Sequence, residues 1–441
     1  MDTKGPDTYD VVGVGFGPAN LSLAIALEEH PDPVSSAFFE QRASLSWHRG
    51  MLLPSAKMQV SFLKDLATFR NPTSPYSFVA YLHASGRLAR FVNNQDFFPT
   101  RREFHDYLEW AEARLRPRVR YGSRVTALHT PPGARAPLDH VLLSVRDTGP
   151  GGATRQVKAR NVVIATGLVP RMPAGVEADV SVWHSSEFLD RFRGHRRPLR
   201  RVAVAGAGQS AAEIVGFLHD TLPDAEIYAV VPAYGYSIAD NTPFANQVFD
   251  PDAIDDYFHG TRRARDAFWQ YHKNTNYSVV DSEVIKDLYR RAYDDELAGT
   301  ERLRFLNLTR VAGVKSVQND VRVTLHSTAR EESYDMDLDV LVCATGYEPM
   351  DPGAVLGDLA PWCLRDTEGR LQVDRDFRLL TTPGLRCGVY LQGGTEHTHG
   401  LSSSLLSNLA TRSAEITSSI ATRLASASTS TSGEGEFAHE R

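Results

Sequence analysis

The chain contains few cysteines, and their spacing excludes several kinds of site. Only Cys343, Cys363 and Cys387 occur among its 441 residues, and no two of them have the Cys-x-x-Cys spacing. Structural zinc sites and redox-active disulfides usually depend on such closely paired cysteines. We therefore expect neither, and we expect buried free thiols in a reducing, cytoplasmic environment.

Long apolar runs and an excess of one charge are also missing. No predominantly apolar run reaches the roughly 20 residues that a membrane-spanning helix needs, and the polar N-terminus does not resemble a signal peptide. The formal net charge is -6, so the charge predicts binding neither to nucleic acid nor to a membrane. With 42% hydrophobic residues, the composition predicts a soluble globular protein of two or three domains.

Two glycine-rich turns are the most informative feature that is present. The first is GVGFGP at residues 13–18, and the second is GAGQSA at residues 206–211. Each follows an apolar run typical of a strand and precedes a helical pattern. Glycines let the backbone approach a pyrophosphate, whose charge then lies at the N-terminus of the next helix. The two turns predict two bound dinucleotides and redox chemistry between them.

The segments around each turn complete a predicted βαβ unit. In the first unit, Glu40 ends the second strand, near the place where an acidic residue binds a ribose. In the second unit, the strand at residues 225–231 is followed by Pro232. Neither the acid typical of NAD(H) sites nor the arginine typical of NADP(H) sites is present there. The preference between NADPH and NADH therefore stays open.

Two buried strand patterns end in Ala-Thr-Gly, at residues 162–167 and 340–347, on either side of the second unit. They predict an α/β fold of two doubly wound, Rossmann-like dinucleotide-binding domains, the second inserted into the first. We expect an FAD-binding domain at residues 1–195 and 341–425 and an NAD(P)H-binding domain at residues 196–340. Within the latter, residues 240–300 form a small, mainly helical substrate segment. Residues 426–441 are rich in Ser, Thr, Gly and Glu and predict a disordered tail.

Further motifs accompany the two turns along nearly the whole chain. They are MQVSFLKDL at 58–66, NPTSPY at 71–76, GAGQSAAE at 206–213, PFAN at 243–246, TNYS at 275–278 and HTHGLS at 397–402. Together with GVGFGPANL at 13–21, they resemble the flavin-dependent N-hydroxylating monooxygenases of ornithine or lysine side-chain amines. The blocks at 61–66 and 275–278 are closer to the L-ornithine N-hydroxylase branch, so ornithine is our expected substrate and lysine the alternative.

The resemblance also assigns residues by position. Lys64 would pair with the substrate carboxylate, Asn246 and Asn276 would bind the amino-acid end, and Ser407 would lie near the amine. We take Asn276, Ser407 and Gln59 as the candidate catalytic residues. The expected cofactor-binding residues are Gly13, Gly15, Gly17, Pro18, Glu40, Trp47, His48, Met58, Gln59, Gly206, Gly208, Gln209, Ser210, Tyr277, Thr345 and Gly346.

The resemblance implies FAD as the resident cofactor, NADPH as the reductant with NADH as an alternative, and O2 as the co-substrate. Oxygen would be activated as a hydroperoxide on the flavin C4a atom, the pathway would be siderophore or related biosynthesis, and the assembly a homotetramer. The family arginine that clamps the coenzyme 2′-phosphate is missing near Pro232. This departure puts a strict dependence on NADPH in doubt.

The residue types suit this function without the family. An amino acid needs a cation for its carboxylate and neutral groups for its ammonium, and Lys64 with two asparagines provides both. Taken alone, a lysine is more often a solvated surface residue and an asparagine a turn residue. His397, His399 and Glu396 lack a further ligand at suitable spacing, so we expect no metal.

Three other functions stand against this one: the chain lacks the residues that two of them need, and one stays as an alternative. A Baeyer-Villiger monooxygenase resembles Phe-x-Gly-x-x-x-His-x-x-x-Trp-Pro, which the segment at residues 182–188 does not match. A flavin disulfide reductase needs paired cysteines near a glycine turn, and these are missing. A dinucleotide-binding sensor without oxygen chemistry remains as an alternative from another class.

Overall fold

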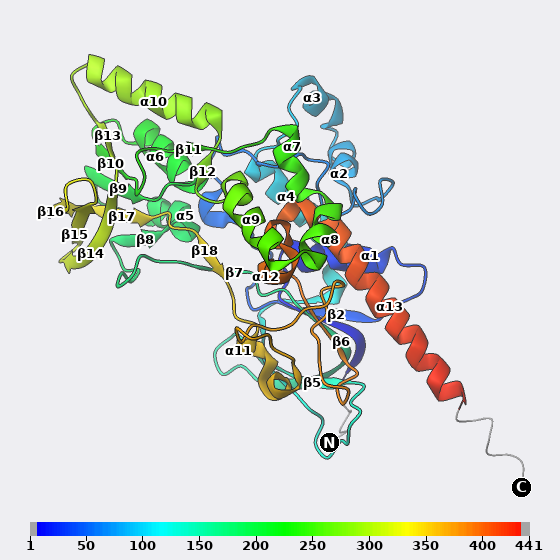
Figure 1. Cartoon of the computed structure of the whole chain (residues 1–441). Helices are drawn as coiled ribbons and strands as arrows, with labels where there is room; N and C mark the ends of the chain where they lie inside the picture. Colours follow the sequence, from blue (N-terminus) through cyan, green and yellow to red (C-terminus); the bar gives the residue numbers. More distant parts are fainter. Residues whose placement is uncertain (1–6, 434–441) are drawn as a thin grey trace, which may run out of the picture.

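The computed structural model describes residues 7–433 (Figure 1). Two mainly parallel sheets form the centres of two units, and a group of short helices lies between them. This arrangement confirms the expected fold class of two Rossmann-like units. Within the described residues, no helix is both long enough and apolar enough to cross a membrane.

The first sheet carries the first glycine turn at the end of its central strand β1. Its strand order is β3-β2-β1-β6-β5-β4, and β19 pairs with β6. β3, β2, β1, β6 and β19 are parallel, whereas β5 and β4 are antiparallel additions at one edge. The bounds are β1 Thr8–Val14, β2 Ser36–Phe39, β3 Val119–Arg120, β4 Ser123–His129, β5 Val141–Asp147, β6 Thr154–Ile164 and β19 Gly388–Leu391.

Helix α1 (Pro18–Glu28) follows this turn and is buried on all sides. Eight consecutive residues from Asn20 to Leu27 are buried because α4 (Arg101–Leu115) and α13 (Leu409–Gly433) pack on it. A helix that is covered all round needs no polar face, so α1 has little amphipathic period. The helices α2 (Phe78–Ala84) and α3 (Leu88–Asn93) complete the cover of this unit.

The second sheet is fully parallel, with the order β13-β10-β9-β17-β8. The second glycine turn of the chain lies in this unit, between β9 and α6. The bounds are β8 Val182–His184, β9 Arg201–Ala205, β10 Glu226–Val230, β13 Leu303–Leu306, β17 Val340–Cys343, α5 Phe188–Gly194, α6 Gln209–Thr221 and α10 Ser282–Leu297. A three-stranded antiparallel sheet of β14 (Thr309–Val317), β15 (Asp320–Ser327) and β16 (Glu332–Leu338) extends this unit.

The expected domain boundaries at 195 and 341 are wrong. Strands β8 and β17 both belong to the second sheet, although we placed residues 1–195 and 341–425 in the first domain. The chain crosses between the units at β7 (Leu168–Pro170) and β18 (Tyr347–Pro349), which pair with each other. Strand pairing is a long-range property, so the local pattern identified both Ala-Thr-Gly strands but did not indicate which sheet each one joins.

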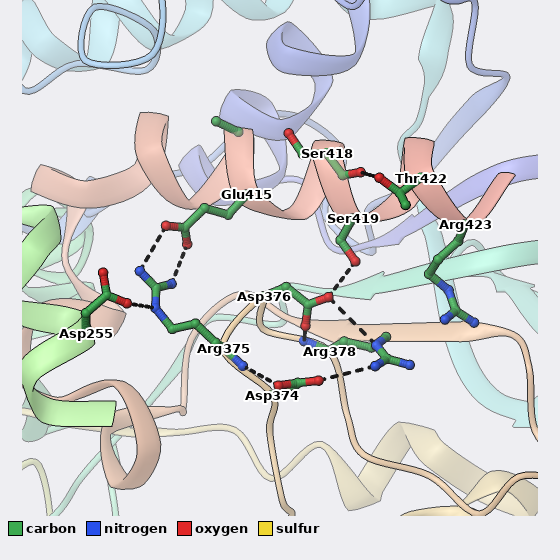
Figure 2. Close-up of a pocket in the computed structure, with 11 residues that line it drawn as sticks. Asp255, Asp374, Arg375, Asp376, Arg378, Glu415, Ser418, Ser419, Thr422 and Arg423 are labelled. Atoms are coloured by element: carbon green, nitrogen blue, oxygen red, sulfur yellow. Dashed lines mark hydrogen bonds and ion pairs between the residues drawn. The ribbon is translucent and has the colours of Figure 1, made fainter. Parts of the chain in front are cut away.

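Three short helices lie between the units, within residues 240–300. They are α7 (Pro243–Asn246), α8 (Pro251–His259) and α9 (Arg262–His272), flanked by the paired strands β11 (Ser237–Ile238) and β12 (Val279–Val280). Figure 2 shows how α8 is tied to the first unit. Arg375 contacts Asp255 of α8 at 2.5 Å and Glu415 of α13 at 2.9 and 3.1 Å.

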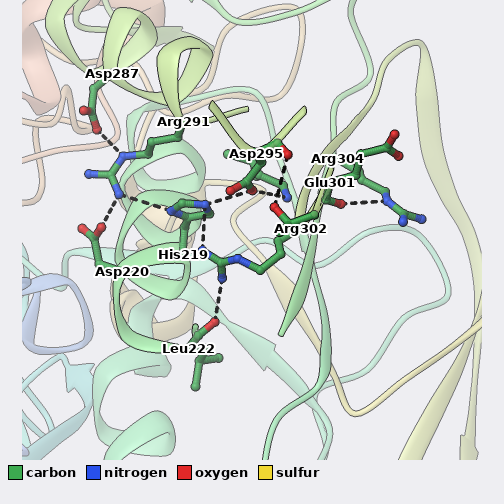
Figure 3. A network of polar contacts seen from close by, with 11 residues as sticks. His219, Asp220, Leu222, Asp287, Arg291, Asp295, Glu301, Arg302 and Arg304 are labelled. Atoms are coloured by element: carbon green, nitrogen blue, oxygen red, sulfur yellow. Dashed lines mark hydrogen bonds and ion pairs between the residues drawn. The ribbon is translucent and has the colours of Figure 1, made fainter. Parts of the chain in front are cut away.

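Helix α10, which also falls within residues 240–300, packs instead on α6 of the second unit. A polar network joins these helices to the start of β13 (Figure 3). His219 of α6 contacts Asp295 of α10 at 3.1 Å, and Asp295 accepts from the backbone N–H of Leu303 at 3.0 Å. Arg291 contacts both Asp220 and Asp287. The network makes α10 part of the second unit rather than of the group of short helices between the units.

The expected disordered tail is wrong at its beginning, because α13 continues to Gly433. Extending a formed helix needs no new nucleus, so a Ser- and Thr-rich stretch can continue a helix that is packed at its other end. Residues 434–441 of the expected tail lie outside the described residues.

Candidate dinucleotide and substrate site

The first glycine turn has the geometry of a phosphate cradle. Gly15 has φ +83°, and a Cβ built there would lie 2.5 Å from the carbonyl oxygen of Ala165. A Cβ on Gly13 would lie 2.2 Å from the Phe38 ring, whereas one on Gly17 would meet no protein atom within 4 Å. No side chain caps α1 after Gly17, and Pro18 starts the helix. The turn therefore leaves the helix N-terminus accessible to an anion.

Glu40 lies beside this turn. One carboxylate oxygen accepts from the backbone N–H of Phe16 at 2.8 Å, and the other accepts from Arg42 at 2.8 Å. These bonds hold the carboxylate at the end of β2, where an acidic residue can bind a ribose hydroxyl. The first turn and Glu40 together fit the nucleotide half of FAD.

Trp47, His48 and Met58 come from the loops that follow β2. The Trp47 ring packs against Phe104 with 5.6 Å between centroids, and Met58 is buried. His48 has φ +46°. The surrounding protein and the Arg101 guanidinium lower the pKa of His48 to about 4. The imidazole is therefore neutral at neutral pH.

The second glycine turn repeats the first. A Cβ on Gly206 would lie 2.3 Å from the carbonyl oxygen of Ala344, and α6 also begins without a side-chain cap. Gln209 follows Gly208 and accepts a hydrogen bond from the backbone N–H of Asp281 at 2.9 Å. Ser210 occupies the first turn of α6, half-buried. This turn fits the pyrophosphate of a nicotinamide coenzyme.

Thr345 and Gly346 lie at the crossover between the units. The Thr345 hydroxyl donates to the Arg171 carbonyl, and the Thr345 carbonyl accepts from the Arg171 guanidinium at 2.9 and 3.1 Å. The carbonyl of Gly346, whose φ is +83°, contacts His184 Nε2 at 3.0 Å. Both residues thus stabilise the crossover between the two units that carry the predicted cofactor sites.

Lys64 is half-buried in a turn after Ser61. Among residues 7–433, no carboxylate pairs with its Nζ. The next residue, Asp65, is a buried carboxylate. Asp65 is occupied elsewhere, since its carboxylate accepts from the backbone of Ala67, Thr68 and Phe78. A cation in this situation suits an anionic ligand.

Asn246, Asn276 and Ser407 come from different parts of the chain. Asn246 ends α7, and the adjoining turn at residues 247–249 packs against residues 401–404, which lead to Ser407. The Tyr277 hydroxyl, next to Asn276, donates to Glu396 of α12 (Glu396–His399). These contacts bring the three segments to the region around α12. No hydrogen bond among the described residues joins Lys64 to either asparagine, so the structure does not by itself assemble all four.

Several buried polar side chains between residues 395 and 408 were not predicted. The Ser407 hydroxyl is buried and has no hydrogen-bond partner within the described part of the chain. The same holds for both polar atoms of Asn408 and for the hydroxyls of Thr395 and Ser403. Buried polar groups normally have partners, so these unpartnered groups indicate contacts with a polar ligand or water. The only feature of the sequence that could have indicated these residues is the position of Asn408 directly after Ser407.

His397 and His399 contact other protein groups. His397 Nε2 contacts the Leu371 carbonyl at 2.8 Å, and the His399 ring stacks on Phe377 at 4.1 Å. Among the described residues, the one cluster with suitable spacing is His105, Asp106 and Glu109 on α4, whose two carboxylates are exposed. Nothing else in the structure marks it as a site.

Comparisons with known proteins agree with this geometry. A solved ornithine N-hydroxylase from Kutzneria sp. 744, described with reduced FAD, NADP+ and L-ornithine, is 70% identical, with a TM-score of 0.91, covering 94% of this chain and 99% of that one. The L-ornithine N(5)-monooxygenase of Burkholderia cepacia is 38% identical, covering 89% of this chain and 90% of its own. A solved L-lysine 6-monooxygenase from Pseudomonas syringae is 28% identical, with a TM-score of 0.79 and coverage of 94% and 99%.

The family model described as L-lysine 6-monooxygenase/L-ornithine 5-monooxygenase matches residues 7–349. This match covers both glycine turns, Lys64 and the two asparagines. The chain therefore belongs to the L-lysine 6-monooxygenase/L-ornithine 5-monooxygenase family.

Proposed function

We infer that this chain is an FAD- and NADPH-dependent monooxygenase that converts the side-chain amine of L-ornithine to a hydroxylamine. One observation carries the proposal: the chain has two uncapped helix N-termini at glycine turns, and it also has a half-buried lysine without a protein carboxylate partner among the described residues. The relatives that are 38% and 70% identical are both ornithine hydroxylases, which supports ornithine over lysine. The sensor alternative has no observation in its favour.

The protein supplies binding, orientation and exclusion of water. FAD, once reduced by the nicotinamide coenzyme, supplies the activation of O2. One oxygen atom enters the product as N–OH, the other leaves as water, and the coenzyme supplies the two electrons. Gly13, Gly15, Gly17 and Glu40 would hold FAD, while Gly206, Gly208, Gln209 and Ser210 would hold the coenzyme.

The substrate must also lose a proton. An amine attacks oxygen only when it is neutral, yet an unperturbed side-chain ammonium has a pKa near 10.4. Removal from water lowers such a pKa. We propose that Lys64 binds the α-carboxylate and that Asn246 and Asn276 orient the amino acid, leaving the far amine beside Ser407. No acidic side chain of this set competes for the ammonium.

Ornithine and lysine differ by one methylene, which is worth about 1–3 kcal/mol in a pocket that fits one of them. The matching test adds FAD to the purified protein and follows hydroxylamine, coenzyme consumption and hydrogen peroxide with each amino acid. NADPH and NADH are compared in parallel. Hydroxylated ornithine with little peroxide supports the proposal. Peroxide alone with both amino acids contradicts the substrate assignment, and no coenzyme oxidation contradicts the enzyme assignment.

We further propose a cytoplasmic homotetramer that acts in siderophore or related biosynthesis. Exposed large side chains support self-association: Tyr234, Phe244 and Tyr271 are 80%, 85% and 80% exposed around the helical segment. Large apolar side chains exposed to this degree are candidates for burial in an interface. Sedimentation of the purified chain tests the assembly, and an F244D variant that dissociates would place the interface at α7. A monomer at all concentrations would contradict this part.

A further inference from the structure

A buried ion pair joins the two dinucleotide-binding units. Arg101 begins α4 of the first unit, and Glu213 lies on α6 of the second. Their side chains form a bidentate pair, with Nη1–Oε2 at 2.7 Å and Nη2–Oε1 at 2.8 Å. The two side chains are only 12% and 6% exposed. Such a pair has a fixed geometry, and removing one partner leaves the other charge buried alone.

Further hydrogen bonds connect this ion pair to residues that we predict to bind the cofactors. Gln209 donates to Glu213 at 2.9 Å and accepts from the backbone N–H of Asp281 at 2.9 Å. Gln59 of the first unit donates to the Asp281 carboxylate at 3.3 Å. The chain of contacts therefore crosses between the units twice, at Arg101–Glu213 and at Gln59–Asp281. It contains the two glutamines that we assign to the flavin and the coenzyme.

Arg101 is itself firmly placed. Its guanidinium also donates to the Met51 carbonyl at 3.2 Å, and its backbone N–H bonds to Ala56 at 2.9 Å. The covalent connection between the units, by contrast, consists of the short paired strands β7 and β18. Two short crossovers alone leave the relative orientation of two sheets free to change, so non-covalent contacts must fix it.

We propose that Arg101 and Glu213 are positioning residues that hold the coenzyme unit in register over the flavin unit. The pair sets the approach of the nicotinamide to the flavin and helps to retain the oxidised coenzyme afterwards. This role rests on the proposed function, because it assigns FAD and coenzyme to the two units. Neither residue touches the reacting atoms in this role.

The test uses R101M, E213M and the double variant R101M/E213M of the full chain loaded with FAD. As a matched control, D337N breaks the bidentate Arg322–Asp337 pair, which is exposed and lies within the β15–β16 hairpin. Anaerobic flavin reduction by NADPH, the KM for NADPH and the peroxide-to-hydroxylamine ratio are measured, together with FAD content per chain.

Each single variant should raise the KM for NADPH or slow flavin reduction about tenfold or more, and should release more peroxide, with FAD content unchanged. The double variant should be no worse than the more impaired single variant, because it leaves no unpaired buried charge. D337N should behave as the unmodified protein. Fully additive losses in the double variant, or single variants with normal reduction and coupling, would overturn the proposal.

Deuterium exchange of the FAD-loaded chain provides a readout apart from activity. E213M should increase uptake in α4 and α6 together, and D337N should not. If the single variants do not fold, E213Q is compared in the same way, because it retains the size of the side chain and loses its charge. Deuterium uptake in E213Q equal to that of the unmodified chain would refute the positioning role of Glu213. Failure of the unmodified chain to oxidise NADPH would contradict the proposed function. The exchange experiment tests the role of the Arg101–Glu213 pair independently of that activity.

Discussion

Single residues carry the proposed recognition of substrate, and Lys64 is the sharpest case. The residue is half-buried, and its ammonium has no carboxylate partner in the described part of the chain. A charged hydrogen bond is worth about 1.5–3 kcal/mol. We expect K64M to raise the KM for ornithine by roughly 10- to 150-fold, while NADPH still reduces the flavin and peroxide accumulates.

The matched control for this prediction is K57M. Lys57 is also a lysine of the same loop region, but it is more exposed and pairs with Asp96 at 2.8 Å. Steady-state kinetics with varied ornithine should therefore show little change for K57M. An unchanged KM in K64M would remove Lys64 from the substrate site.

His399 predicts a dependence of stability on pH. It is 1% exposed and stacks on Phe377. Burial and the nearby charges of Arg375, Arg412 and His397 lower its pKa from 6.5 to about 3. Between these values the unfolded chain binds a proton that the folded chain does not. With respect to His399, the free energy of unfolding is therefore highest above pH 6.5. It falls by about 1.4 kcal/mol for each pH unit below that value.

Denaturant unfolding between pH 4.5 and 7.5 tests this sign. H399Q should remove that part of the slope, whereas H83Q, at an exposed histidine of α2, serves as the control and should keep it. An identical slope in H399Q and the unmodified chain would contradict the assignment. The midpoint itself is expected to fall in H399Q, because the ring packing against Phe377 is lost.

At the scale of elements, the strand–turn–helix units are where the sequence was most informative. Gly13, Gly15 and Gly206 were predicted from short-range pattern alone, and the structure gives each a physical reason in a carbonyl or ring that a Cβ would strike. The strands β8 and β17 were assigned to the wrong unit, because β17 pairs with both β8 and β9, and these pairings join residues far apart in sequence. Arg101 and Glu213 escaped for the same reason, since 112 positions separate them.

The glycines of the first turn predict two different mutant behaviours. A Cβ on Gly15 would strike the Ala165 backbone, so G15A should destabilise the apoprotein. Gly17 has open space around its Cβ direction, so G17A should leave the apoprotein stable yet weaken FAD binding by about tenfold, or ~1.4 kcal/mol. G194A, at another glycine with open space, is the control for G17A. Thermal unfolding and FAD titration separate the two effects, and normal FAD affinity in G17A would contradict a phosphate at this turn.

At the scale of the whole molecule, the helical segment that we propose for substrate binding contacts the C-terminal part of the chain. Tyr277 is bonded to Glu396, and Trp269 donates to the Tyr257 hydroxyl at 2.8 Å within the segment. The sequence predicted that residues 240–300 are mainly helical. It did not predict that α10 would leave this segment and pack on α6, because an amphipathic pattern does not specify which surface covers it.

Arg375 should link this arrangement to substrate affinity. It joins Asp255 of α8 to Glu415 of α13, and its side chain is 24% exposed, so the contacts are partly screened by water. We expect R375M to loosen α8 and raise the KM for ornithine about threefold to tenfold, with the rate of flavin reduction by NADPH unchanged. R291M is the matched control, since Arg291 also bridges two carboxylates but lies between α6 and α10. If R375M and R291M change the KM for ornithine equally, the effect comes from general destabilisation, and α8 is not held in place for the substrate by Arg375.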